Sequence, residues 1–226
     1  MKRPSVSGSI PVTGSPALPR SRSCYSWCSA PPSTNSTSPF PILFQGASTL
    51  PARIFTIGHS TRSIEDFLAL LMQHGIMQVV DVRKLDGSRK FPQFNSDALQ
   101  ASLKAAGIGL HREEALAGRR PVSQSVDFEV NAWWRNRSFH NYADHALGDD
   151  FLHAIQQLQE RAVGQKIAIM CAEAVWWRCH RRIIADYLLA RGAEVLHIID
   201  GPEAKAAELS PGAVICPQLR ITYPAA

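Results

Sequence analysis

Short apolar runs alternate with amphipathic segments along the chain from Arg53 onward. The apolar runs have the length of buried strands and lie at residues 54–57, 79–82, 108–111, 167–171 and 195–199. Between them, apolar side chains recur at helical spacing over residues 63–75, 96–106, 150–163 and 178–191. Strands that alternate with helices predict a mainly parallel sheet with helices on both faces. The predicted fold class is therefore an α/β three-layer sandwich, in which residues 113–148 follow neither period and are left irregular.

Residue types that start and stop helices support these boundaries. The Ser63 hydroxyl is expected to cap the first helix, with Glu65 and Asp66 in the first turn, where the helix dipole favours acidic side chains. Glycines, which commonly end helices, follow the helical segments at Gly75, Gly107 and Gly192.

Residues 1–50 have a different composition from the rest of the chain. They hold twelve Ser and eight Pro and show no sustained apolar periodicity. Such a segment buries too little surface to offset the entropy of ordering it. We expect a disordered extension, or a translation start assigned too far upstream, rather than a targeting segment, followed by a single α/β domain over residues 51–226.

The charge of the whole chain is misleading about partners. Its 24 basic and 19 acidic side chains give a net charge of +5, but four of the basic side chains lie in residues 1–50, which contain no acid. The remaining 20 basic and 19 acidic side chains leave residues 51–226 with a net charge of +1. Charge alone therefore does not support a nucleic-acid partner. No apolar run reaches the length of about 18 residues that a membrane-spanning helix needs, and five cysteines are too few for a disulfide scaffold.

Polar, titratable residues follow three of the predicted strands directly. In open α/β sheets, ligands bind outside the carboxyl ends of the strands, so these residues are the first candidates for a site. The first strand is followed by His59, the second ends in Asp81-Val82-Arg83, and the fourth runs into Cys171-Ala172-Glu173 and then 176–182 (Trp-Trp-Arg-Cys-His-Arg-Arg).

These same segments carry a resemblance to a known family. The set Thr56-Ile57-Gly58-His59-Ser60, Asp81-Val82-Arg83, Phe94-Asn95, Cys171-Ala172-Glu173 and Cys179-His180-Arg181 resembles the domain of unknown function 488 family. The resemblance covers about residues 53–200 and implies a small α/β protein of the prokaryotic cytoplasm, without supplying a reaction; some relatives carry DNA-repair labels. The chain departs from the family pattern at 85–88, at Leu116-Ala117-Gly118 and at 142–146.

Cys171 is a candidate catalytic nucleophile. It ends a predicted strand near Arg178, Arg181 and Arg182, and faces the start of a helix, an arrangement that stabilises a thiolate. Phosphatase-like and rhodanese-like loops use such a cysteine, but position 177, where those loops carry an arginine, holds Trp177. The alternative is a buried structural cysteine, which is the commoner role at the end of a core strand.

A zinc site is the second interpretation of the same segment. Cys171, Cys179 and His180, with His59 as a further candidate, would provide thiolate and imidazole ligands. Adjacent residues such as Cys179 and His180 point about 100° apart if both are helical, which argues against this interpretation. The alternative role of His180 is a structural hydrogen bond to a carbonyl.

Four residues are candidates for binding or proton transfer. Asp81 and Arg83 lie two apart on a strand and point the same way, so they form either a structural ion pair or an orienting pair in which Arg83 binds an anion. Glu173 is a candidate general acid or base, and so is His59. For each of them, a structural hydrogen bond is the alternative.

Two classes of function follow from these candidates. In the first, a small cytoplasmic enzyme acts on an anionic or nucleotide-like substrate, with Cys171, Glu173 and His59 catalytic and with substrate held by Asp81, Arg83, Arg178, Arg181, Trp176 and Trp177. In the second, a nucleic-acid-associated module without chemistry uses the arginines and Trp176-Trp177 as an anion-binding and stacking surface. The cluster of Cys, Glu and His favours the enzyme, because a purely electrostatic binder does not need it.

Overall fold

The computed structural model of the chain describes residues 51–225. Its centre is a six-stranded sheet in the order β3-β2-β4-β1-β5-β6. The first five strands in that order are parallel, and β6 pairs antiparallel with β5. The strands are β1 (Arg53–Gly58), β2 (Gln78–Asp81), β3 (Gly109–Arg112), β4 (Ile167–Cys171), β5 (Glu194–Ile198) and β6 (Lys205–Ala206). The mainly parallel sheet expected from the sequence is confirmed.

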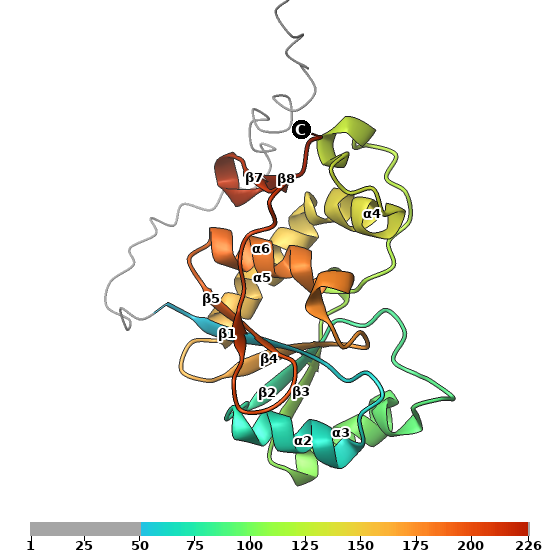
Figure 1. Cartoon of the computed structure of the whole chain (residues 1–226), viewed down its shortest axis with the longest axis vertical. Helices are drawn as coiled ribbons and strands as arrows, with labels where there is room; N and C mark the ends of the chain where they lie inside the picture. The colour runs from blue at the N-terminus through green and yellow to red at the C-terminus, as the bar shows by residue number, and fades with distance from the viewer. Residues whose placement is uncertain (1–50, 226) are drawn as a thin grey trace, which may run out of the picture.

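Helices cover both faces of the sheet, so the three-layer sandwich is also confirmed (Figure 1). One face carries α2 (Ile64–Gln73) and α3 (Ser96–Ala105), and the other carries α4 (Arg137–Ala146), α5 (Asp149–Arg161) and α6 (Arg181–Ala190). None of the helices within residues 51–225 has the length and apolar character to cross a membrane.

The apolar core is divided into two parts by the sheet. In β4, Ile167 and Ile169 face the α4–α6 layer, whereas Ala168 and Met170 face α2 and α3. All five residues of β4 are buried, which explains why its sequence is a continuous apolar run and not an alternating one. Cys171 ends this strand on the α4–α6 side.

The local signals at the first helix work as expected from the sequence. The Ser63 hydroxyl accepts a hydrogen bond from the backbone N–H of Asp66 at 3.0 Å. Gly75 follows the helix with a positive φ of +68°, a conformation that costs glycine little. These contacts define where α2 begins and ends, and hence where the chain turns into β2.

The structure differs from the expectation in residues 113–148. This segment contains α4, whose N-cap is Asn136, and α4 buries the polar side chains of His140 and Asp144 together with Tyr142, Ala143 and Ala146. Asp144 accepts a hydrogen bond from the Asn131 amide at 2.8 Å and lies 3.3 Å from His140. Because these polar groups satisfy one another, they share the buried face with apolar side chains and interrupt the apolar period that would reveal the helix.

The start of α6 and the C-terminal region also differ from the expectation. Residues Trp176–Arg178 form a short 3-10 turn, η4, so α6 begins three residues later than expected. Near the C-terminus, a two-stranded sheet of β7 (Val214–Ile215) and β8 (Ile221–Thr222) has strands too short to leave a sequence pattern. The extension predicted at residues 1–50 lies outside the described residues.

Candidate functional site

The carboxyl ends of β1, β2 and β4 meet at one edge of the sheet, because β4 pairs with both neighbours. Beyond the strand pairing, the His59 N–H donates to the Cys171 carbonyl at 3.0 Å. A Cβ at position 58 would lie 1.8 Å from the Glu173 carbonyl oxygen, so only glycine lets the two chain segments pass this closely. The three polar segments found in the sequence are therefore neighbours in space.

Cys171, Cys179 and His180 form one cluster at this edge. The Nδ1 atom of His180 lies 3.6 Å from Sγ of Cys179 and 4.0 Å from Sγ of Cys171. All three atoms lie within 4.8 Å of one another. Cys179 has an extended backbone (φ −132°, ψ 149°) and precedes the helix, so the objection that two adjacent helical residues diverge does not apply here.

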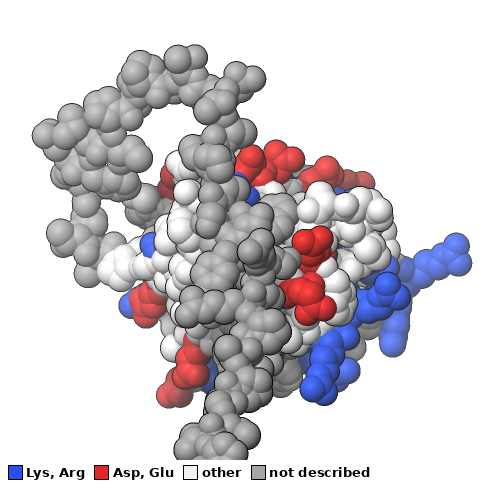
Figure 2. All heavy atoms as spheres, turned by 90° about the horizontal axis from the view of Figure 1, so that it is seen from above, with Lys and Arg blue, Asp and Glu red and all other residues white. Residues whose placement is uncertain are grey.

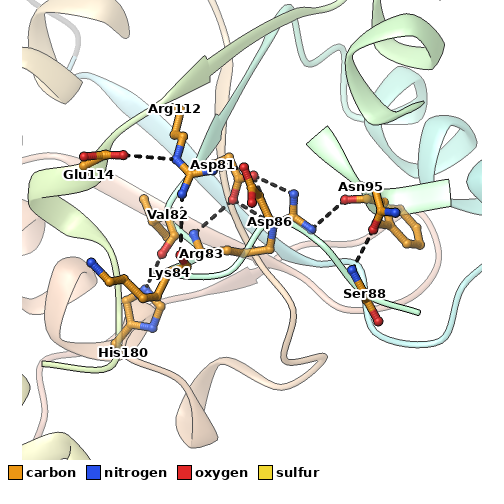
Figure 3. A network of polar contacts seen from close by, with 11 residues as sticks. Asp81, Val82, Arg83, Lys84, Asp86, Ser88, Asn95, Arg112, Glu114 and His180 are labelled. Atoms are coloured by element: carbon orange, nitrogen blue, oxygen red, sulfur yellow. Dashed lines mark hydrogen bonds and ion pairs between the residues drawn. The ribbon is translucent and has the colours of Figure 1, made fainter. Parts of the chain in front are cut away.

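The ring of His180 has a defined orientation. Its Nε2 atom lies 3.1 Å from the carbonyl oxygen of Val82, just beyond β2, and must donate there because a carbonyl only accepts (Figure 3). In the neutral ring, Nδ1 then carries a lone pair directed at the two sulfurs. The Tyr142 ring packs against the imidazole at a centroid distance of 4.8 Å, and its hydroxyl donates to the Leu116 carbonyl at 2.7 Å.

Arg181 supports the cluster from inside the protein. Its side chain is 1 % exposed, and its Nε donates to Sγ of Cys179 at 3.4 Å. The remaining donors reach the carbonyls of Glu173 and Ala174, and the hydroxyl of Thr56 at 3.5 Å. The guanidinium thus ties the loop after β4 to the start of α6 and is turned away from solvent.

The two thiols differ in their acidity. Burial alone would raise the pKa of Cys179, but a hydrogen bond from Cys171, the His180 ring where it is protonated, and the positive charge of Arg181 hold that pKa well below its usual range. The pKa of Cys171 lies well above its usual range, because the hydrogen bond to Cys179 and burial both favour its protonated form. Cys179 is therefore the more acidic of the two thiols.

A pocket of about 250 Å³ opens beside the cluster and is lined by all three of its residues. Three exposed cations also line it, and within residues 51–225 no ion pair joins any of them to an acid: Lys84, Arg119 and Arg178. Glu173 is the one carboxylate among the lining residues. The predicted site residues Cys171, Glu173, Arg178 and the metal candidates are thus brought together.

Asp81 and Arg83 form a buried ion pair (Figure 3). Arg83 Nε lies 2.9 and 3.0 Å from the two carboxylate oxygens, and Nη2 lies 2.7 Å from one of them. Nη1 donates to the Phe94 carbonyl at 2.8 Å. Both side chains are engaged with protein groups, as in the structural alternative, although Arg83 also borders the pocket. Their role in substrate binding stays a prediction.

His59 lies apart from the pocket-lining residues. Its ring stacks on Phe94 at a centroid distance of 4.2 Å, and Nδ1 lies 3.1 Å from the Ser60 carbonyl. Burial, together with the charge of Arg83, lowers the pKa of His59 to about 4, so the ring is neutral near neutral pH. Its nitrogens are not part of the cluster formed by Cys171, Cys179 and His180. The catalytic role assigned to it stays a prediction.

The tryptophan pair lies beside the site without lining the pocket. Trp176 stacks on His197 at a centroid distance of 4.3 Å and an angle of 11°, so one face of its ring is already covered. Trp177 is 46 % exposed and meets Trp176 edge-on. Stacking of a base on this pair, and with it the nucleic-acid alternative, stays a prediction.

Sequence reasoning missed several residues of the pocket. Lys84, Gly118, Arg119 and Tyr142 all line it. Three of them come from residues 113–148, where no period was found. The sequence carries no signal for Arg119, but its backbone has a positive φ of 54°, and such conformations cluster at functional sites.

The fold and the site define a class: an α/β protein with a cysteine–histidine–arginine cluster at the carboxyl edge of a parallel sheet. The model of one family, described as Domain of unknown function DUF488, matches residues 63–188, which is more than half of the chain. The chain belongs to this family. The matched range contains Cys171, Cys179 and His180, whereas β1 and His59 precede it. Searches of curated proteins and of solved structures gave no match.

Proposed function

We propose that this protein is an enzyme that binds a small anionic substrate in the 250 Å³ pocket and acts on it through the adjacent cluster of Cys171, Cys179 and His180. The observation that carries the proposal is the convergence of cations without acidic partners and of chemically reactive side chains on one pocket. A structural cysteine cluster would not require a positively charged opening.

The charge of the pocket supports an anion. Lys84 follows β2, Arg119 follows the loop after β3, and Arg178 ends η4, so three separate segments each bring one cation to the same opening. Cations that no neighbouring acid neutralises attract an anion and raise its local concentration. Figure 2 shows that the largest group of basic side chains on the visible surface gathers on one side of the molecule, although residues 51–226 are nearly neutral as a whole.

The size of the pocket supports a small substrate. Sites for drug-sized ligands usually measure about 300–1,000 Å³, so a volume of about 250 Å³ suits a compact phosphate, sulfate or carboxylate compound. A mononucleotide would extend beyond the pocket onto the surface around it. The nucleotide-like substrate is therefore the less favoured member of the anionic class.

The residues around the cluster divide into binding, proton-transfer and positioning roles in this proposal. Arg119 and Arg178 bind the anion, and Glu173 transfers protons at the pocket opening. Arg181 and the Asp81–Arg83 pair are positioning residues, because their donors and acceptors are engaged with protein groups that hold the loops after β2 and β4.

Calorimetric titration of the full chain with inorganic phosphate and with sulfate tests the binding step. Replacing both Arg119 and Arg178 by alanine is expected to weaken anion binding at least about tenfold, because each substitution removes one charge-assisted contact. Lys104→Ala, an exposed change on α3 outside the pocket, is the matched control. The proposal fails if the native chain binds neither anion, or if the double variant binds as tightly as the control.

A panel of phosphate, sulfate and carboxylate esters tests the chemical step. Turnover of at least one of them is expected, and Cys179→Ser should abolish it while Lys104→Ala retains it. Equal turnover by Cys179→Ser and the native chain would exclude the cluster as the reactive centre.

A further inference from the structure

We infer that Cys171, Cys179 and His180 bind a zinc ion with three protein ligands and that the fourth coordination position opens into the pocket. The inference rests on the proposed function, because it names the cofactor with which the cluster would act on the anion. Its evidence is independent of the pocket's charge and consists of distances, ring orientation and the space beside the imidazole.

The distances between the three atoms are close to those of a zinc coordination sphere. With Zn–S near 2.3 Å and Zn–N near 2.0–2.1 Å, tetrahedral geometry separates a sulfur from a nitrogen by about 3.5 Å and two sulfurs by about 3.8 Å. Nδ1 of His180 lies 3.6 and 4.0 Å from the two sulfurs, and no separation within the set exceeds 4.8 Å. The two sulfur–nitrogen distances are thus within about 0.5 Å of zinc geometry and the sulfur–sulfur distance within about 1 Å, so small side-chain shifts would place the three atoms at three corners of a tetrahedron.

The orientation of His180 is that of a metal ligand. Metal-binding histidines commonly donate their second ring N–H to a carbonyl or carboxylate, which presents the lone pair of the other nitrogen to the metal. Here the Val82 carbonyl accepts from Nε2 at 3.1 Å, and Nδ1 is the atom that faces the sulfurs.

Gly118 leaves open the space beside this lone pair. A Cβ at position 118 would lie 2.8 Å from Nδ1 of His180 and 2.9 Å from its Cε1. Gly118 is buried, so the methyl group of an alanine would contact the His180 ring and would not point into solvent. Absence of a side chain at this position keeps Nδ1 accessible.

Three ligands and a pocket indicate a catalytic rather than a purely structural metal. Structural zinc sites use four protein ligands, whereas catalytic sites use three, including two cysteines with one histidine, and leave one position for water or substrate. Within residues 51–225, no fourth Cys, His, Asp or Glu completes the set. All three ligands line the pocket, so an anion bound there would meet the open position. When bound, zinc would polarise an oxygen of the anion or acidify a bound water.

The choice of zinc follows from the chemistry of the ligands. Two thiolates and an imidazole are soft and borderline ligands in a tetrahedral arrangement, which suits zinc far better than magnesium, calcium or manganese. Arg181, which donates to Sγ of Cys179 at 3.4 Å, would then act as an outer partner that partly neutralises the two thiolates.

Metal content of the full chain, purified without chelator, tests the inference directly. We expect about one zinc ion per chain by mass spectrometry of the elements, and an intense thiolate-to-cobalt absorption band after replacement by Co²⁺. Cys171→Ser, Cys179→Ser and His180→Gln should each lose most of the metal. His153→Gln, an exposed histidine on α5, should retain it.

A second variant keeps the test valid if a ligand substitution prevents folding. Gly118→Ala retains all three ligands but crowds Nδ1, so it should weaken zinc binding by about 10–100-fold, as changes around the ligands do, while circular dichroism stays native. If Gly118→Ala binds zinc with native affinity, the proposed position of the metal beside Nδ1 of His180 is wrong. A Cys171–Cys179 disulfide, stoichiometric copper, or reduced thiols that bind neither zinc nor cobalt would overturn the inference as a whole.

The open position has its own test, which also separates this inference from the proposed function. Inorganic phosphate should perturb the visible spectrum of the cobalt protein, and the perturbation should be lost when Arg119 and Arg178 are replaced by alanine. If phosphate binds by calorimetry but leaves the spectrum unchanged, the open coordination position is refuted and the anion site still stands. Stoichiometric zinc without any phosphate binding would refute the proposed function and leave the metal site standing.

Discussion

Two buried clusters lie side by side at the carboxyl edge of the sheet, and they differ in whether their polar groups satisfy one another. The Asp81–Arg83 pair is closed: two carboxylate oxygens meet one guanidinium in three contacts of 2.7–3.0 Å, and a carbonyl takes a further donor. The cluster of Cys171, Cys179 and His180 is open. It directs a ring nitrogen and two sulfurs to one point, where the available donors are an S–H and the Arg181 Nε.

The difference teaches how to tell a structural cluster from a ligand site. A closed pair loses its hydrogen bonds if anything enters, so it resists ligands and holds the loop after β2 in place. An open set of electron-pair donors gains contacts when a cation enters it. The sequence contains both as short strings of titratable residues at strand ends, and composition does not distinguish them.

The largest expected effect comes from breaking the closed pair. Arg83→Ala leaves the Asp81 carboxylate 4 % exposed without its counter-ion, and removing one member of a buried pair costs about 3–5 kcal/mol. Urea unfolding measures this loss. The double variant Asp81→Leu/Arg83→Met should unfold at a higher urea concentration than Arg83→Ala. A loss below about 1 kcal/mol in Arg83→Ala would mean that the pair is not closed.

The second effect should appear when the open cluster is emptied. If the free zinc concentration is about a hundred times the Kd of the cluster, removing the zinc with a chelator should lower the free energy of unfolding by about 2.7 kcal/mol. The same chelator should leave Cys179→Ser unchanged, because that variant holds no metal to lose. Thermal unfolding with and without chelator measures the difference, and equal shifts in both proteins would show that the chelator acts elsewhere.

The fold could be predicted where burial imposes a period. The β4 run and the helix that became α5 follow directly from apolar spacing, since both faces of β4 are covered. The helix α4 could not, because it buries the hydrogen-bonded His140 and Asp144 among its apolar core residues, and these polar residues interrupt the apolar period. The turn η4 could not be predicted either, and it delays the start of α6.

The site could be predicted only where it coincides with strand ends. Cys171 ends β4 and Cys179 and His180 follow it, so the rule that ligands bind at carboxyl edges pointed to all three residues. Gly118 and Arg119 come from the loop after β3, and their proximity to His180 depends on how that loop crosses the edge. The objection that the adjacent residues Cys179 and His180 diverge holds only if both are helical, and the sequence does not show that Cys179 is extended.

His197 is an intermediate case between closed and open. Its Nδ1 lies 2.7 Å from the Thr56 hydroxyl, whereas Nε2 is buried without a partner among the described residues. Burial, with the charges of Arg181 and Lys205, lowers the pKa of His197 to about 3. The unfolded chain, with a histidine pKa near 6.5, therefore binds this proton more readily than the folded one.

The sign of the pH effect follows from that difference. The contribution of the neutral His197 to the free energy of unfolding is complete above about pH 6.5. It falls by about 1.4 kcal/mol per pH unit below that, so about 2 kcal/mol is lost at pH 5. Urea unfolding at pH 7 and pH 5 measures the slope. His197→Asn should reduce the slope even if it is less stable throughout, and an unchanged slope would assign the effect to another group.

The smallest effect is expected at an ion pair that is neither closed nor buried. Arg53 and Glu194 lie 2.6 Å apart on β1 and β5, but their side chains are 52 % and 38 % exposed. Water and salt compete with such a pair, so Arg53→Ala should cost at most about 1 kcal/mol, although its distance is shorter than those between Asp81 and Arg83. Urea unfolding at low and high salt tests this, and the loss should shrink further at high salt. A loss as large as that of Arg83→Ala would mean that distance, and not enclosure by the protein, determines what a polar cluster contributes.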